Sequence, residues 1–220
     1  MRRVLVLRPE PGASATVAKA RERGLDAFAV PLFEIESIEW SAQEPNQFDG
    51  LLLTSANAVR SAGERLSELR SLPVYAVGEA TAEAAREAGF DIAATGNAGV
   101  GRLLASIDPD LKLLHLCGED RRVVSVSNQQ ITPIVVYRSK PIVDPDLSVA
   151  RNAVALIHSP RAGHRFADLA DNRGSIVIAA ISEAAADAVG GGWMTIEVAT
   201  SPNDDALLAL AARLCDKPAE

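Results

Sequence analysis

Short apolar runs alternate with longer amphipathic stretches along almost the whole chain. Such runs, bounded by polar residues, are typical of buried strands, whereas an apolar residue at every third or fourth position is typical of a helix. The predicted strands are Val4–Leu7, Ala27–Val30, Leu51–Leu53, Val74–Val77, Leu113–Leu116 and Ile176–Ala180. The predicted helices are Gly12–Arg23, Ala56–Glu68, Glu79–Ala88 and Asp204–Leu214, the last with Asn203 as its cap. Strand–helix alternation predicts an α/β fold with parallel sheets flanked by helices and right-handed crossovers.

Two stretches of the chain repeat one pattern. The first reads LLLTSANAV (51–59) and then YAVGEATAEAA (75–85), and the second reads ALIHSPRAG (155–163) and then AAISEAAADAV (179–189). Thr54 precedes Gly78 by the same number of positions as His158 precedes Ser182. Each copy is a strand, a helix, a strand and a helix, which Gly89 and Gly192 are expected to close. The repeat predicts two similar α/β lobes.

Two extended segments flank the first copy of the repeat. Residues 31–39 (PLFEIESIE) and 131–140 (ITPIVVYRSK) alternate apolar and polar side chains. We interpret them as a two-stranded connector, with hinges near 35–38 and 135–139. Residues 38–135 then form one lobe, inserted into a discontinuous lobe made of 1–34 and 139–220. Two consecutive domains remain the alternative. The hinge interpretation places a ligand cleft between the lobes.

Composition agrees with an ordered globular protein. The chain has 220 residues, of which 48 % are hydrophobic, 23 % charged and only 4 % aromatic, which suits Ala-rich helices packed on parallel sheets. The N-terminal MRRVLVLRPE is too brief for a signal peptide, and no run is long enough to span a membrane. Cys117 and Cys215 lie far apart without metal-ligand spacing, so we expect reduced thiols, no metal and a cytoplasmic location.

Net charge and motif content exclude several classes of function. A net charge of −7 with scattered basic residues argues against nucleic acid as a partner. Residues 99–104 (GVGRLL) lack the third glycine of a dinucleotide-binding loop and follow no clear strand, and a phosphate-binding P-loop is absent. A receiver-type signalling domain is disfavoured because Arg8 and Pro9, rather than acidic residues, follow the first strand.

Both copies of the repeat place small polar residues where a strand ends and a helix begins. The unpaired N–H groups and partial positive charge of a helix start favour anions by about 0.3–1 kcal/mol each. Hydroxyl donors would add to them from Thr54, Ser55, Thr81, Ser159 and Ser182. The alternative is that these residues are helix caps and nothing more, because Ser and Thr are preferred there in any case.

Seven short motifs, in order, resemble those of uroporphyrinogen-III synthases. They are VLVLRP, PLFEIES, TSANAV, VGEATA, VVYRS, HSPRAG and AISEAAADAVGGGW, and they cover the chain from Val4 to about Leu210. The resemblance implies a two-lobed α/β fold with a two-stranded connector. It also implies an enzyme, a cyclising hydro-lyase of tetrapyrrole and haem biosynthesis. Its substrate is the linear tetrapyrrole polycarboxylate hydroxymethylbilane, and no cofactor, metal or membrane is needed. We expect a monomer.

The implied reaction is a ring closure with inversion of ring D. Loss of the terminal hydroxyl as water gives an azafulvene cation, which is attacked at the substituted carbon of ring D to make a spiro intermediate. Fragmentation and reclosure then yield the type III isomer, whereas the unassisted substrate closes to type I. The enzyme must therefore hold the conformation that leads to the spiro route, which is mainly a problem of positioning.

The resemblance also assigns candidate site residues. Tyr137, in VVYRS, is the candidate acid for the departing hydroxyl; the alternative is a tyrosine packed at the junction of the lobes. The candidate substrate-binding residues are Arg8, Thr54, Ser55, Asn57, Gly78, Thr81, Gly118, Ser159, Pro160 and Ser182. Arg8 is nearly as well explained as a structural or solvated residue. His158, at the position of Thr54 in the repeat, is interpreted as packing.

The chain departs from the family in two places. Ala184 and Ala185 stand where the family often has a hydroxyl, and the segment between Glu119 and Gln130 is short. The competing function is a non-catalytic two-lobed binding protein for a small anion or tetrapyrrole. Product analysis with hydroxymethylbilane distinguishes the two.

Overall fold

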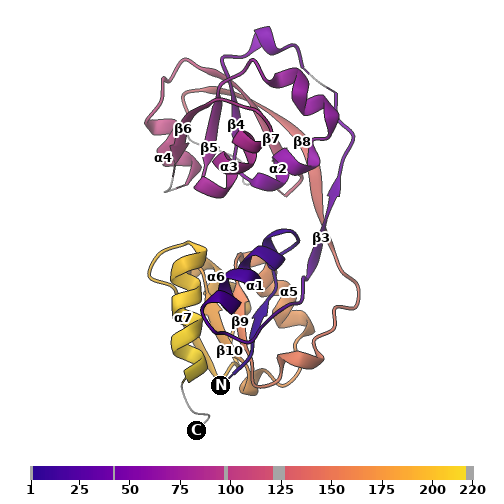
Figure 1. The fold of residues 1–220 in the computed structure, drawn as a ribbon, viewed down its shortest axis with the longest axis vertical. Helices are drawn as coiled ribbons and strands as arrows, with labels where there is room; N and C mark the ends of the chain where they lie inside the picture. Colours follow the sequence, from indigo (N-terminus) through magenta and orange to yellow (C-terminus); the bar gives the residue numbers. More distant parts are fainter. Residues whose placement is uncertain (1, 42, 97–98, 121–126, 217–220) are drawn as a thin grey trace. The chain divides into compact units, whose positions relative to one another are not determined.

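A computed structural model describes residues 2–41, 43–96, 99–120 and 127–216 of the chain. The protein divides into two compact units (Figure 1). Unit 1 is made of Met1–Glu34 and Pro141–Glu220, and unit 2 is Ile35–Lys140. Unit 2 is therefore inserted, in sequence, between the two parts of unit 1.

Unit 1 is built on a five-stranded sheet in the order β11-β10-β9-β1-β2. Its strands are β1 (Val4–Val6), β2 (Ala27–Ala29), β9 (Val154–Ile157), β10 (Val177–Ala180) and β11 (Thr195–Val198). All its neighbouring strands pair in parallel, and β1 lies between β2 and β9, with Val4 opposite Val154. The N-terminal strand thus completes the sheet of the C-terminal half.

The central strands of unit 1 are apolar at every position because both faces of the sheet are covered. Leu5 and Leu7 point into one core, whereas Val4 and Val6 point into the other. Helices α1 (Gly12–Glu22) and α7 (Asp204–Asp216) contribute to the second core, and α5 (Pro160–Leu169) and α6 (Glu183–Val189) to the first.

A glycine allows α5 and α6 to pack closely. A Cβ atom on Gly163 would lie 3.1 Å from the Ala185 carbonyl oxygen and 3.1 Å from the Ala188 Cβ. Beside this contact, the rings of Phe166 and Trp193 stack with centroids 5.2 Å apart. This face of the sheet is therefore closed by a tight helix pair and one aromatic stack.

Unit 2 is built on a six-stranded sheet in the order β3-β8-β7-β4-β5-β6. Its strands are β3 (Phe33–Ser37), β4 (Gly50–Leu53), β5 (Val74–Val77), β6 (Ile92–Gly96), β7 (Lys112–Gly118) and β8 (Gln130–Pro141). Helices α2 (Ala56–Ser61) and α3 (Glu79–Glu87) cover one face, where Leu51 and Leu53 are buried, and α4 (Val100–Ala105) covers the other, where Leu52 is buried. Short 3-10 turns lie at Pro45–Gln47, Glu64–Leu69, Ser148–Ala150 and Arg173–Ser175.

The two sheets share one topology. In each sheet, three parallel strands that follow one another in sequence run from a central strand to one edge. They are β9, β10 and β11 in unit 1, with β9 central, and β4, β5 and β6 in unit 2, with β4 central. On the other side of that central strand lies β1 in unit 1 and β7 in unit 2. The strand order therefore reverses between β9 and β1, and between β4 and β7. The carboxyl ends of strands at such a reversal are where open α/β sheets bind ligands.

Local departures from the predicted elements have identifiable causes. Helix α2 ends at Ser61 because Gly63, with φ of 68°, breaks the path and a 3-10 turn follows. Helix α6 is closed by Gly190, with φ of 63°, and not by Gly192, which lies beyond it. Strand β6 does precede the glycines of residues 99–104, contrary to the prediction. The short segment between Glu119 and Gln130 falls mostly outside the described residues.

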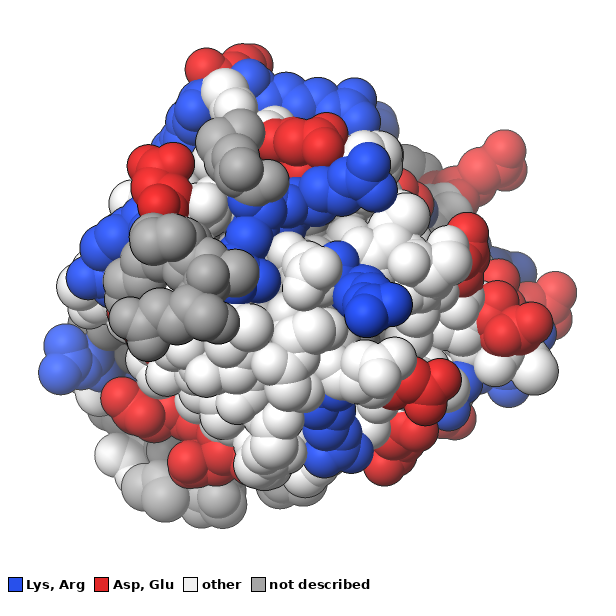
Figure 2. All heavy atoms as spheres, turned by 90° about the horizontal axis from the view of Figure 1, so that it is seen from below, with Lys and Arg blue, Asp and Glu red and all other residues white. Residues whose placement is uncertain are grey.

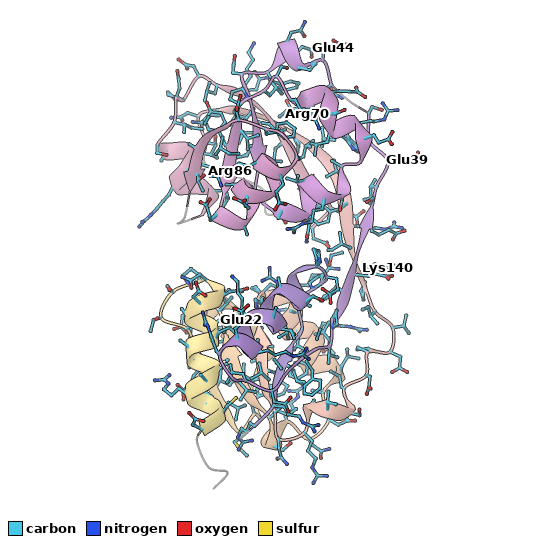
Figure 3. The ribbon with its side chains drawn as sticks, in the orientation of Figure 1. Glu22, Glu39, Glu44, Arg70, Arg86 and Lys140 are labelled. Carbon is cyan, nitrogen blue, oxygen red and sulfur yellow. The ribbon has the colours of Figure 1, made fainter. Side chains whose placement is uncertain are left out.

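Charges of both signs are distributed over the surface. Figure 2 shows acidic and basic side chains together on the face that it draws. Figure 3 labels three of the exposed charged side chains: Glu22 on α1, Arg86 on α3, and Glu44, which precedes the 3-10 turn Pro45–Gln47. Among the described residues, no helix is both long and apolar enough to cross a membrane.

Candidate functional site

In unit 2 the carboxyl end of β4 carries Thr54 and Ser55. The Ser55 hydroxyl accepts a hydrogen bond from the Asn57 backbone N–H at 3.2 Å and so caps α2. Thr54 Oγ1 and His115 Nε2 lie 3.1 Å apart in a hydrogen bond that joins β4 to β7. Thr54 and Ser55 are predicted site residues, and each already has a hydrogen-bond partner within the unit.

The next strand end in unit 2 leads into α3 through Gly78. Its φ of 83° is a left-handed conformation that favours glycine, and no side chain caps the helix that follows. The backbone amides of the first turn of α3 are therefore not occupied by a capping side chain. Thr81 is only 4 % exposed and packs toward the core, so its hydroxyl does not face solvent.

Tyr137 lies on β8 against Gly118, the last residue of β7. The Glu119 backbone N–H donates to the Tyr137 carbonyl at 2.9 Å, which fixes the two strand segments together. A Cβ atom on Gly118 would lie 2.7 Å from the Tyr137 Cζ and 2.9 Å from its hydroxyl. Glycine at position 118 is therefore what allows the phenol to lie across the end of β7. The sequence motifs alone did not predict this contact.

In unit 1 the equivalent strand ends carry Ser159 and Ser182. The Ser159 hydroxyl accepts from the Ala162 N–H at 3.2 Å, and the Ser182 hydroxyl accepts from the Ala185 N–H at 3.3 Å. Pro160 occupies the first turn of α5, where its missing N–H is not needed. Both serines are helix caps and remain partly exposed at the edge of the sheet.

Arg8 lies at the same edge of unit 1, and its guanidinium pairs with Asp204. Nη1 is 3.1 Å from each carboxylate oxygen. The Thr16 hydroxyl donates to Asp204 Oδ2 at 2.9 Å, and His158 Nε2 lies 3.2 Å from Oδ1. Burial alone raises the pKa of Asp204, but the imidazole, the guanidinium and the hydroxyl outweigh it and hold that pKa well below its usual range.

Sequence reasoning missed this cluster. The sequence predicts a packing role for His158, because it shows no evident acidic partner, yet Asp204 is that partner. Its only local signal is an acidic residue in the first turn of a helix, directly after the Asn203 cap. Helix starts favour acidic residues in any case, so the signal is ambiguous.

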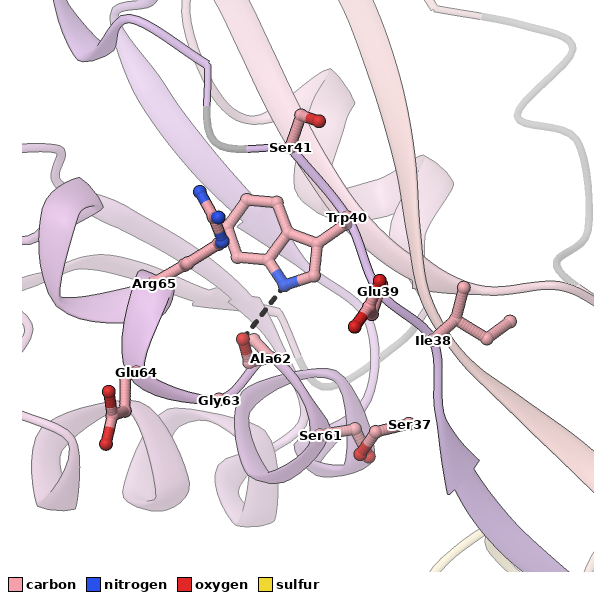
Figure 4. Close-up of a pocket in the computed structure, with 10 residues that line it drawn as sticks. All are labelled: Ser37, Ile38, Glu39, Trp40, Ser41, Ser61, Ala62, Gly63, Glu64 and Arg65. Carbon is pink, nitrogen blue, oxygen red and sulfur yellow. Dashed lines mark hydrogen bonds between the residues drawn. The ribbon is translucent and has the colours of Figure 1, made fainter.

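A polar pocket of about 720 Å³ lies elsewhere on unit 2, and Figure 4 shows its lining. It surrounds Trp40, whose indole N–H donates to the Ala62 carbonyl at 2.8 Å. Arg65 and Glu39 contribute charge to the lining. The pocket is at the C-terminal end of α2, away from the carboxyl end of β4, and contains none of the predicted site residues.

No group of three or more His, Cys, Asp or Glu side chains suited to a metal ion occurs within 2–41, 43–96, 99–120 and 127–216. The polar groups at the two strand-order reversals include backbone amides, hydroxyls and Arg8, which can donate to anions. They also include the Thr54–His115 pair and the Asp204 carboxylate with its three partners. The candidate sites are therefore the carboxyl edges of the two sheets.

Two similar, largely parallel sheets define a two-unit α/β protein, in which one unit is inserted into the other in sequence and helices start at the carboxyl edge of each sheet. Comparison with known families narrows this class. The family described as "Uroporphyrinogen-III synthase HemD" matches residues 14–209, and the chain belongs to that family.

Individual relatives agree with the assignment. A protein of Archaeoglobus fulgidus named "Putative uroporphyrinogen-III synthase" is 36 % identical over 81 residues, which are 37 % of this chain and 34 % of that protein. The matched stretch thus spans about a third of that relative. The crystal structure of uroporphyrinogen-III synthetase from Helicobacter pylori superposes with a TM-score of 0.67 at 19 % identity, covering 97 % of this chain and 100 % of the other. A mutant synthase from Thermus thermophilus gives 0.53 at 17 %, covering 99 % and 100 %. At these identities the structures support the fold.

Proposed function

We propose that the protein is a uroporphyrinogen-III synthase, a cyclising hydro-lyase acting on hydroxymethylbilane. The observation that carries the proposal is family membership over residues 14–209. The two carboxyl edges support it, because the substrate's many carboxylates match backbone and hydroxyl donors at helix starts.

In this proposal the helix starts orient the substrate. The first turn of α3 after Gly78 binds a substrate carboxylate through backbone N–H groups that no side chain caps. The start of α5 after Ser159 contributes fewer backbone donors, because Pro160 has no N–H and Ser159 caps the Ala162 N–H. The remaining proposed contacts at the strand ends come from Thr54, Ser55, Asn57, Gly118, Pro160 and Ser182. Arg8 contributes indirectly, since its guanidinium is engaged by Asp204. The buried hydroxyl of Thr81 is the weakest of the expected contacts.

Tyr137 is the proposed acid. Its phenol donates a hydrogen bond to the terminal hydroxyl of the substrate as the C–O bond breaks and water leaves. The azafulvene cation then reacts at the substituted carbon of ring D, because the bound conformation brings that carbon nearest. Fragmentation of the spiro intermediate and reclosure give type III. Positioning supplies most of the selectivity, and the phenol accelerates the first step.

Incubation with freshly prepared hydroxymethylbilane tests the proposal. The products are oxidised to porphyrins and separated by isomer, with protein omitted as the control. Formation of type III in excess of the control supports a synthase. Binding of the bilane with only spontaneous type I product would instead indicate a non-catalytic tetrapyrrole-binding protein.

We further propose that the protein acts as a monomer in the cytoplasm, without a nucleic-acid partner. The net charge of −7 disfavours binding to nucleic acid. Light scattering on a size-exclusion column measures the mass directly, and a dimer mass would refute the monomer.

A further inference from the structure

One carboxylate in unit 1 receives side chains from three separate segments of the chain. Asp204, at the start of α7, is contacted by Arg8 after β1, by Thr16 in α1 and by His158 after β9. Arg8 and Asp204 are 196 positions apart in sequence. The carboxylate therefore links the start of α7 to the segments that follow β1 and β9 and to α1.

The first turn of α1 leaves room for the arginine. A Cβ atom on Gly12 would lie 2.7 Å from Arg8 Nε and 3.0 Å from its Cζ. Glycine at this position leaves room for the guanidinium beside the helix start, with Nη1 in contact with the carboxylate. The arginine is thus directed inward to Asp204 by the local shape of the chain.

His158 contributes a buried imidazole to the same carboxylate. Its side chain is 8 % exposed, and neither ring nitrogen makes an aligned hydrogen bond. Nε2 nevertheless lies 3.2 Å from Asp204 Oδ1. Buried polar atoms normally have partners. The Asp204 carboxylate lies close enough to serve as a partner of this imidazole.

The cluster lies at the strand-order reversal of unit 1. β1 and β9 are neighbours in the sheet, and Arg8 and His158 follow their carboxyl ends. Ser159, the next residue after His158, caps α5. A shift of the imidazole would therefore move the start of α5, which is one of the proposed substrate-binding turns.

Helix capping does not account for the carboxylate of Asp204. The cap of α7 is Asn203, whose side-chain oxygen accepts from the Ala206 N–H at 2.9 Å. Asp205 is also acidic and lies in the same first turn, but its carboxylate pairs with Arg23 and is 73 % exposed. Asp205 therefore serves as a matched control for charge at the helix start.

We propose that Arg8, Thr16 and His158 form a carboxylate-binding site that Asp204 fills from within the chain, and that Asp204 is a positioning residue for ring closure. The carboxylate-binding site is inferred only from the contacts of Arg8, Thr16 and His158 with Asp204. Its effect on ring closure rests on the proposed function. Asp204 acts through His158 and Arg8, which fix the carboxyl ends of β9 and β1, and does not itself touch the substrate.

The test removes the carboxylate and supplies it again from solution. Asp204→Ala leaves Arg8, Thr16 and His158 without their anion, and sodium formate is the probe. We expect the melting temperature of Asp204→Ala to fall below that of the wild type and to rise again with formate, but not with sodium chloride at equal ionic strength. Asp205→Ala should show no response to formate beyond that of the wild type. A melting temperature of Asp204→Ala that formate does not change would overturn the carboxylate-binding site.

Ring closure provides the second measurement. Well below the melting temperature, Asp204→Ala should form type III about ten- to a hundred-fold more slowly, with partial recovery in formate, because a misplacement of about 1 Å has effects of this size. A folded variant with the wild-type rate would overturn the positioning role, even if formate restores its stability. If the wild type itself forms no type III product, the proposed function fails, and the melting temperatures still decide the carboxylate-binding site.

Asp204→Asn keeps the test decisive if the alanine variant does not fold. The amide has nearly the same shape but lacks the charge, and it fills the site. We expect slower formation of type III and no rescue by formate. A wild-type rate in Asp204→Asn would overturn the proposal that the charge positions this edge.

Discussion

Replacing Gly118 by alanine displaces the Tyr137 phenol without removing it. The added Cβ would lie 2.7 Å from Cζ of the ring, whereas ordinary contacts begin near 3.4 Å, so the ring or the end of β7 must move by about 0.7 Å. Gly118 does not have a positive φ, so alanine fits its backbone and the effect comes from the contact. Overpacking of this kind costs about 1–3 kcal/mol of stability.

The same displacement should slow catalysis. A misplacement of about 1 Å can cost up to about a hundred-fold in rate, so a shift of about 0.7 Å predicts a loss of roughly ten-fold, or about 1.4 kcal/mol of barrier. The assay is the initial rate of type III formation, with spontaneous type I formation subtracted, measured well below the melting temperature. Gly101→Ala is the matched control, because nothing lies within 4 Å of its Cβ and it is helical. Its rate should equal that of the wild type, with stability raised by about 0.5–1 kcal/mol.

A double mutant tests whether the effect passes through the phenol. Tyr137→Phe alone should slow type III formation by about ten- to a hundred-fold, since the bound conformation still directs the reaction. Gly118→Ala combined with Tyr137→Phe should cost less than the two single effects together, because both act on one group. A folded Gly118→Ala variant with the wild-type rate would refute this reasoning. A Tyr137→Phe variant yielding only type I would show instead that the phenol is indispensable.

Three further predictions concern stability and reactivity. Because the pKa of Asp204 is lowered in the folded state, its ionised form stabilises the protein above about pH 4, and this contribution is lost as the pH falls. The difference in unfolding free energy between wild type and Asp204→Asn should therefore shrink in acid. A difference that does not change with pH would contradict this prediction. Phe166→Ala, which removes a fully buried ring stacked on Trp193, should cost about 3–5 kcal/mol in denaturant unfolding, and a loss below 1 kcal/mol would speak against the core assignment. Burial, with a smaller effect of nearby Asp216, raises the pKa of the Cys215 thiol to about 11. Iodoacetamide at pH 8 should therefore label this thiol only after the protein unfolds, which mass spectrometry of native and unfolded protein can check.

The central strands could be predicted from the sequence because a strand buried on both faces is apolar at every position. Val4–Val6 and Gly50–Leu53 are continuous apolar runs, since alternate side chains enter two different cores. Helix ends were less predictable. Gly63 and Gly190 both adopt positive φ. Gly63 lies inside the stretch predicted as one helix, and Gly190 is followed by two more glycines, so the residue that ends each helix depends on how the following segment packs.

The candidate site likewise contains some contacts between residues close in sequence and others between residues far apart in sequence. The caps at Ser55, Ser159 and Ser182 depend on neighbours two or three positions away, so the sequence predicts them well. The partner of Arg8 does not follow from any local pattern, because Asp204 is brought to it only when α7 packs beside α1 on one face of the sheet. Long-range charge pairs of this kind become visible only in the folded structure.

The isomer of the ring-closed product tests the central claim most directly. With protein in molar excess over hydroxymethylbilane, every substrate molecule can bind before it closes spontaneously. The account predicts that the type III fraction rises with protein concentration until type III is nearly the whole product. A type III fraction that stays at the level of the protein-free control at every concentration would contradict it.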